Sequence, residues 1–233
     1  DGISVSLSNL AIKEANAEVR SQLVCSARRL PAKLAFQILN NLISNHDDYT
    51  DPDIPLLLWW ALESKAATDR EMVVSFFSKP ALWAKPVVKE VLLKRIMQRY
   101  VMSGAPADYA LASQLIDKAP SEEYALILLG GLQEGLRGRN IIDLPAELVR
   151  KIQPYLAKSG EGGLALGIRQ GDKPSIDGAL KIIGDPKGKL TERMAYIKVL
   201  GEVGEQRAIP VLLNVAISRQ SSGALQQAAL HSL

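Results

Sequence analysis

The chain has 233 residues, of which 47% are hydrophobic, so it is long enough to bury one large core or two small ones. Its 28 basic side chains nearly balance 25 acidic ones, and a net charge of +3 is too small to indicate nucleic acid or a membrane surface as partner. The single Cys25 excludes a disulfide within the chain, and only two histidines remain for a zinc site. There is no run of about 18 apolar residues that would span a membrane.

Apolar residues at spacings of three and four predict helices along the chain, and almost no strand is expected. Asn16 is a predicted N-cap, and Pro31 separates the two helices of a hairpin. Ser121 is another expected cap. The expected helices are residues 3–14, 17–30, 32–45, 54–67, 69–77, 87–102, 107–118, 122–136, 145–157, 161–170 and 175–183.

The stretch 54–62 contains no charged residue and includes Trp59 and Trp60 side by side. A helix that is apolar on every side needs cover all round, so we expect both tryptophans to lie in a core. An acidic segment, residues 46–53, leads into this helix.

Residues 191–218 show the clearest repeat. Thr191 is expected to cap a first helix, and the glycines at 201 and 204 allow close packing and a turn before a second helix. The arrangement resembles a short HEAT repeat at Arg193, Leu200, Gly201, Gly204, Ala208, Pro210 and Leu212. Residues 225–233 look like the start of the next repeat.

A helical hairpin cannot bury its own apolar face, so the pattern predicts an all-α fold in which hairpins stack into one HEAT-like or armadillo-like solenoid over residues 1–233. We expect repeats of longer helices in 1–136, irregular glycine-rich short helices in 137–190, and a HEAT repeat with the beginning of another in 191–233. The C-terminus stops within an amphipathic pattern, which indicates a fragment of a longer protein.

Three strings carry a closer resemblance: EVRSQLVCSARRLP at 18–31, HDDYTDPDIPLLLWWALE at 46–63 and DRE at 69–71. They resemble the helical-repeat segment of exported multidomain proteins of planctomycetes and related bacteria. Those membrane-bound dehydrogenase-like or haem-binding proteins join a sugar-dehydrogenase-like β-propeller, a HEAT-type segment and a c-type cytochrome domain. The resemblance implies a periplasmic or cell-envelope location. No C-x-x-C-H motif occurs here, so no cofactor is expected in this segment, although haem c is implied for the parent protein.

The acidic segment offers a candidate site for a hard cation, because clustered carboxylates suit calcium. Its candidate ligands are His46, Asp47, Asp48, Asp51 and Asp53. The spacing does not match an EF-hand loop. The alternative, which we favour, is a solvated turn in which Asp51 or Asp53 caps the following helix.

Candidate contact residues lie nearby. Trp83, between two prolines, is a candidate exposed aromatic, and helical spacing places Lys85, Lys89 and Arg99 close together with Lys94 opposite them. A solvated face is the default interpretation of these cations, and an acidic partner surface is the alternative. Cys25 is expected to be buried and inert. The glycines of 160–171 match no phosphate-binding motif.

We therefore expect a non-catalytic scaffold that binds a protein or a neighbouring domain of the same chain. The alternative is a segment of a haem c-containing sugar-dehydrogenase-like enzyme that docks the cytochrome domain, and it is based on the resemblance alone. A weaker third hypothesis is a HEAT-type lyase acting on a bilin.

Overall fold

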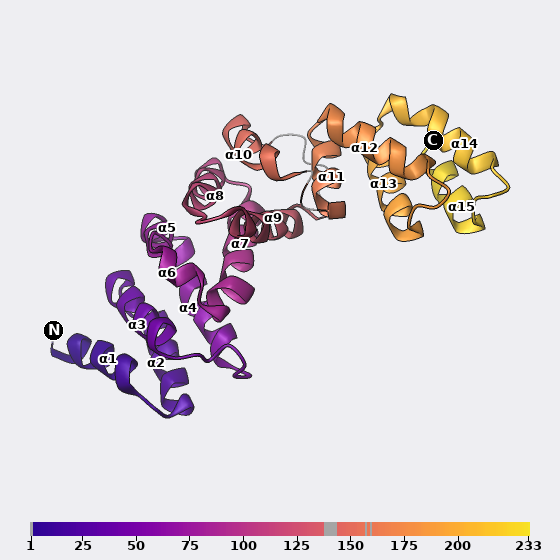
Figure 1. The fold of residues 1–233 in the computed structure, drawn as a ribbon. Helices are drawn as coiled ribbons and strands as arrows, with labels where there is room; N and C mark the ends of the chain where they lie inside the picture. Colours follow the sequence, from indigo (N-terminus) through magenta and orange to yellow (C-terminus); the bar gives the residue numbers. More distant parts are fainter. Residues whose placement is uncertain (1, 138–143, 157, 159) are drawn as a thin grey trace. The chain divides into compact units, whose positions relative to one another are not determined.

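The computed structural model describes residues 2–137, 144–156, 158 and 160–233, and this part of the chain is helical without any β-strand (Figure 1). The prediction of an all-α fold is confirmed. No helix in these ranges is both long enough and apolar enough to cross a bilayer. The elements are α1 (Gly2–Lys13), α2 (Ala17–Arg29), α3 (Ala32–Asn45), α4 (Ile54–Ala66), α5 (Arg70–Phe76), α6 (Pro80–Trp83), the π-helix η1 (Val88–Leu92), α7 (Leu93–Ser103), α8 (Pro106–Lys118), α9 (Glu122–Leu136), α10 (Ala146–Leu156), α11 (Gly160–Arg169), α12 (Lys173–Gly184), α13 (Leu190–Val203), the 3-10 helix η2 (Gln206–Ala208), α14 (Ile209–Ile217) and α15 (Gly223–His231).

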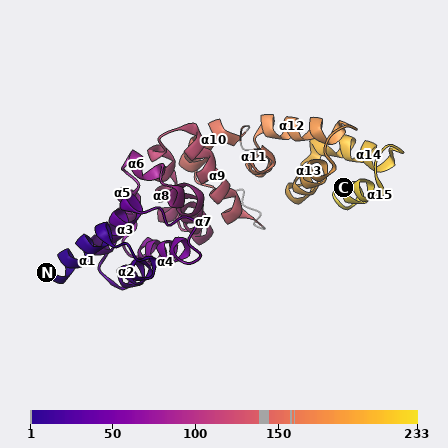
Figure 2. The same ribbon diagram turned by 60° about the horizontal axis from the view of Figure 1, so that its bottom comes forward.

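The chain divides into two compact units, Asp1–Gly135 and Leu136–Leu233. In the first unit the helices fall into two sets. The first set is α1, α3, α5 and α8, each packed against the next, and the second set is α2, α4 and α7 (Figures 1 and 2). Helices adjacent in sequence, such as α2 and α3 or α7 and α8, join the two sets. Each helix is therefore covered by its neighbours in the same set and by the sequence-adjacent helices of the other set.

The second unit repeats this alternation. Helix α13 packs against α11 and α15, and α14 packs against α12 and α15. Gly204 ends α13 with a φ of 64°, and a Cβ on Gly201 would lie 2.6 Å from the Cβ of Ser232. These positions confirm that the two glycines provide the turn and the close packing. The expected cap at Thr191 is wrong, because α13 begins at Leu190 and Lys189 occupies the N-cap position.

Helix α4 is central to the first unit, and it contacts α2, α3, α5 and α7. Trp59 is only 7% exposed, whereas Trp60 is 42% exposed and Leu56 is 36% exposed. The prediction that both tryptophans are buried is wrong for Trp60. Consecutive helical residues point about 100° apart, and the covering helices leave one stripe of α4 open to solvent.

Cationic side chains hold several helix C-termini. Lys65 of α4 is 8% exposed, and its Nζ donates to the carbonyl oxygens of Arg28 at 2.9 Å and Leu30 at 2.8 Å, at the end of α2. Arg193 of α13 is 7% exposed and donates through Nε to the Ile183 carbonyl, 3.0 Å away at the end of α12. The last carbonyls of a helix have no partner within the helix and carry partial negative charge, so a cation satisfies both demands.

Helix α9 approaches the backbone of α7 closely. A Cβ at Gly131 would overlap the main-chain carbonyl oxygen of Lys94, and one at Gly135 would lie 3.0 Å from the carbonyl oxygen of Gln98. A Cβ at the neighbouring Gly130 would meet no atom within 4 Å. The absence of a side chain at Gly131 therefore sets the separation of the two helices.

Replacing Trp59 by alanine should lower the free energy of unfolding of the first unit by about 3–5 kcal/mol, because it removes a buried indole. Replacing the exposed Trp60 should cost less than about 1 kcal/mol. All three tryptophans lie in the first unit, so the fluorescence of those that remain reports its unfolding in denaturant. Equal losses for the two variants would contradict the assigned orientation of α4.

The two neighbouring glycines of α9 make a matched pair. Gly131→Ala should destabilise the first unit by about 1–3 kcal/mol, because the α7 backbone must move. Gly130→Ala should stabilise it by about 0.5–1 kcal/mol, because alanine is the better helix former where space is open. Tryptophan fluorescence during urea unfolding measures both, and a neutral Gly131→Ala would show that α9 does not contact α7.

Candidate functional site

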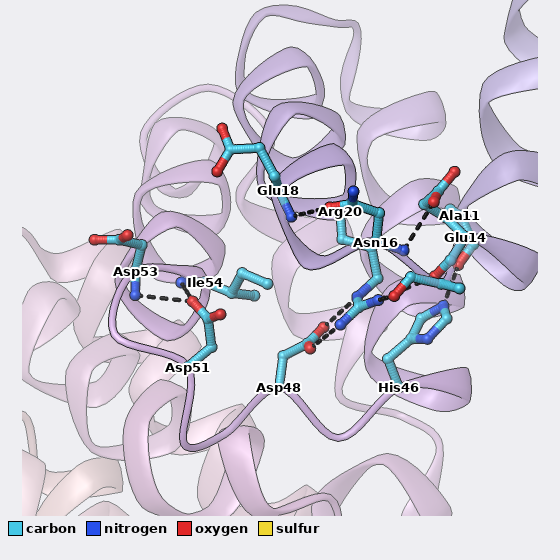
Figure 3. A network of polar contacts seen from close by, with 11 residues as sticks. Ala11, Glu14, Asn16, Glu18, Arg20, His46, Asp48, Asp51, Asp53 and Ile54 are labelled. Carbon is cyan, nitrogen blue, oxygen red and sulfur yellow. Dashed lines mark hydrogen bonds and ion pairs between the residues drawn. The ribbon is translucent and has the colours of Figure 1, made fainter.

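The acidic loop, residues 46–53, is held by Arg20 of α2 (Figure 3). The Arg20 guanidinium forms a bidentate ion pair with the Asp48 carboxylate, in which Nε lies 2.8 Å from Oδ2. Its Nη1 also donates to the carbonyl oxygens of Glu14 at 3.0 Å and Ala15 at 2.8 Å, just after α1 ends. The hydrogen bonds that Arg20 donates to the Asp48 carboxylate raise the pKa of Arg20 above its ordinary value. One side chain thus joins α2, the end of α1 and the loop.

Sequence reasoning did not single out Arg20, although a signal was present. Leu23, Val24 and Ala27 are the buried residues that follow it in α2, at offsets of three, four and seven. A cation at the first position of an apolar helical face has to find a partner, because an unpaired buried charge is costly.

Asp51 caps α4, as the favoured interpretation of the loop predicts. Its Oδ1 accepts hydrogen bonds from the main-chain N–H groups of Asp53 and Ile54, both at 2.9 Å. These two hydrogen bonds lower the pKa of the Asp51 carboxyl below its ordinary value of 3.8, and the bond from the Ile54 N–H has the larger effect. Asp53 occupies the N-cap position without a side-chain bond to the helix.

The five candidate cation ligands do not converge. His46 contacts the Ala11 carbonyl oxygen through Nε2 at 3.0 Å, Asp48 faces Arg20, and Asp51 faces the helix end (Figure 3). Asp47 is exposed. Within the described ranges, no three His, Cys, Asp or Glu side chains are grouped so that they could hold a metal. The side chains of the loop instead link α1, α2 and the start of α4.

Trp83 is fully buried at 0% exposure, so the expectation of an exposed aromatic is wrong. Its Nε1 donates to the Phe77 carbonyl at 2.8 Å, and its ring meets Phe77 and Tyr124 edge-on at centroid distances of 5.9 and 5.6 Å. Pro80 begins the short helix α6 rather than an open loop, and this helix turns the indole inward. Cys25, expected to be buried, is half-buried.

The basic residues expected on one face contact different elements. Lys85 donates to the Ser44 carbonyl at the end of α3, 2.7 Å away, and Arg99 pairs with Glu63 of α4 at 3.6 Å. Lys89 pairs instead with Glu123 of α9 at 2.5 Å.

The expectation that Lys94 lies on the opposite face of the helix from Lys89 is also wrong. Lys94 pairs with Glu134 at 3.8 Å, so both lysines face α9. The cause is η1, where the Leu93 N–H bonds to the Val88 carbonyl five residues earlier. A π-turn adds one residue to the turn, and residues five apart then face the same way.

The first unit carries a groove that sequence reasoning missed. It has a volume of about 500 Å³ and crosses α1, α3 and α5, three successive members of the first set. The floor consists of Phe36 and Phe76, whose rings are 5.2 Å apart, while Met72 at 37% exposure and Val5 at 60% exposure lie at the rim. The remaining lining residues are Ser8, Asn9, Lys33, Gln37, Asn40, Asn41, Ser75 and Lys79.

The polar lining of the groove contains amides, hydroxyls and ammonium groups without a carboxylate. Asn41 bridges α1 and α3, because its Nδ2 donates to the carbonyl and hydroxyl oxygens of Ser8, both at 2.9 Å. The sequence signal was the stripe Lys33, Gln37, Asn40 on α3, which has helical spacing and no acidic member. Only the packing of α1 and α5 beside α3 converts that stripe into a groove.

Asp51→Ala should lower the free energy of unfolding of the first unit by about 1 kcal/mol, through loss of the cap. Because folding lowers the pKa of Asp51, its contribution is present above the ordinary pKa of 3.8 and disappears as the pH falls through the folded-state value. Asp51→Asn, which keeps an acceptor oxygen, should lose less and should lack this pH dependence. Urea unfolding followed by tryptophan fluorescence at neutral and acid pH measures both.

Asp47→Ala is the control for this cap, because Asp47 is an exposed carboxylate of the same loop without a partner in the described structure. It should leave stability unchanged. A loss equal to that of Asp51→Ala would show that general loop charge, rather than the cap, is responsible.

Comparison of the chain with protein-family models, with curated proteins and with solved structures finds no match. The resemblance of residues 18–77 to exported multidomain proteins is not tested by these comparisons and stays a prediction.

Proposed function

We propose that this chain is an α-solenoid of the HEAT-like or armadillo-like kind, and that it acts as a non-catalytic scaffold for another protein or a neighbouring domain. The alternation of helices between two sets in each unit supports the solenoid. Stacked helical hairpins present the outer faces of one set as a continuous surface, and proteins built in this way use such surfaces for binding.

The groove over α1, α3 and α5 is the observation that carries the binding role. Three successive helices of one set contribute to it, and its polar side chains are largely exposed over an aromatic floor. Exposed polar groups around an apolar floor are typical of sites that bind a partner. The location in an exported protein, between a propeller and a cytochrome domain, belongs to the same proposal and is based on the sequence resemblance.

A photoreactive amino acid placed at Gln37 in the full chain tests the binding role. In extracts of the cells that make the protein, illumination should join the groove to a small, reproducible set of proteins or domains, identified by mass spectrometry. Gln37 is exposed and lines the groove, so the replacement should not disturb the fold.

The control carries the same amino acid at Arg29, which is exposed on α2 in the second set of helices. Different products at the two positions would support a specific surface. Identical products at both, or none at either, would exclude a scaffold that binds through this groove.

A further inference from the structure

The lining of the groove combines two unpaired cations with the absence of any carboxylate. Lys33, in the first turn of α3, and Lys79, just after α5, are exposed, and their side chains make no ion pair or hydrogen bond in the described part of the chain. Elsewhere in the unit Lys89 and Lys94 have glutamate partners. The exposed carboxylate of α5, Glu71, is absent from the lining. The groove therefore has a positive potential that a ligand can neutralise.

Amide side chains without partners set a second requirement for a ligand of the groove, besides negative charge. Asn9, Gln37 and Asn40 line the groove, and their side chains have no hydrogen-bond partner among the described residues. Each amide presents both donors and an acceptor, which match the N–H and C=O groups of an extended main chain. Asn41 is different, because its bonds to Ser8 hold α1 against α3.

The aromatic floor of the groove sets a third requirement for the ligand, an apolar group. Phe36 and Phe76 are 8% and 9% exposed, so only a small part of each side chain reaches the groove. That part is apolar. Met72 at the rim is 37% exposed and flexible enough to fold over an inserted group. A ligand with at least one large apolar side chain would bury this surface.

We propose that the groove binds an extended acidic segment of a partner protein, with carboxylates at Lys33 and Lys79, main-chain groups at the free amides and one large apolar side chain on the Phe36–Phe76 floor. This inference rests on the proposed scaffold function and names the chemistry of the partner. Two cations over an apolar floor suit a peptide better than nucleic acid or a lipid surface, which are recognised by clusters of several basic residues.

The test uses a fluorescein-labelled peptide of alternating Glu and Gly with one central Phe, and fluorescence anisotropy of the full chain. The acidic peptide should bind about tenfold more tightly than the same peptide with Gln in place of Glu, since each exposed ion pair contributes modestly. Substituting Gly for the central Phe should also weaken binding, and added salt should reduce the difference between the Glu and Gln peptides.

The double variant Lys33→Gln with Lys79→Gln should weaken binding of the acidic peptide about tenfold and leave the Gln peptide unaffected. The matched control is Arg28→Gln with Arg29→Gln, which removes two exposed cations without side-chain partners from α2. It should leave both affinities unchanged. Ser75→Trp, which fills the exposed groove, should abolish binding of both peptides while thermal unfolding by circular dichroism remains cooperative.

The inference is overturned if the acidic peptide does not bind, if the α2 control weakens binding as much as the groove variant, or if Ser75→Trp has no effect. It is also overturned if a single-stranded oligonucleotide or phosphatidylserine vesicles bind as tightly through the same lysines. A specific crosslink from Gln37 combined with any of these results would leave the scaffold function standing and reject only the acidic peptide.

Discussion

The last carbonyl groups of a helix need hydrogen-bond donors, and in this protein cationic side chains of later elements supply them. Each bond joins the end of one helix to a residue further along the chain, and so sets how neighbouring helices stack. Removing such a cation would leave carbonyls unsatisfied, and removing its carboxylate, where it has one, would leave a charge in a poorly hydrated place. The instances are Lys65 for α2, Lys85 for α3 and Arg193 for α12, and Arg20 does the same for the carbonyls that directly follow α1.

Apolar packing in the first unit is organised around a chain of aromatic rings. Phe36 and Phe76 form the groove floor, Phe76 meets Phe77 edge-on at 5.3 Å, and Phe77 in turn meets the buried Trp83. Tyr124 of α9 completes the series. The groove floor is thus the outer end of the core, so its shape is set by rigid packing rather than by surface side chains. A rigid floor lowers the entropy lost when a ligand binds.

Charge pairing separates the cations that link helices from those that stay open to solvent. Lys89, Lys94 and Arg99 have carboxylate partners on α9 or α4 and thus link elements within the first unit. Lys33 and Lys79 have none in the described structure, and their groove contains no carboxylate. The distinction matters because basic residues on a single helix look alike in a sequence, whereas their partners come from elements far along the chain.

The sequence by itself determined most of the helices, because apolar spacing, prolines and caps such as Asn16 act within a few residues of the chain. It also indicated the packing role of Gly201 and the capping role of Asp51, whose partners are local or imposed by backbone geometry. Tertiary structure alone decided that Trp60 is exposed while Trp59 is buried, and that a π-turn brings Lys94 to the same side as Lys89. It alone also created the groove, since a groove exists only where helices distant in sequence lie side by side, and no local pattern specifies which faces will meet.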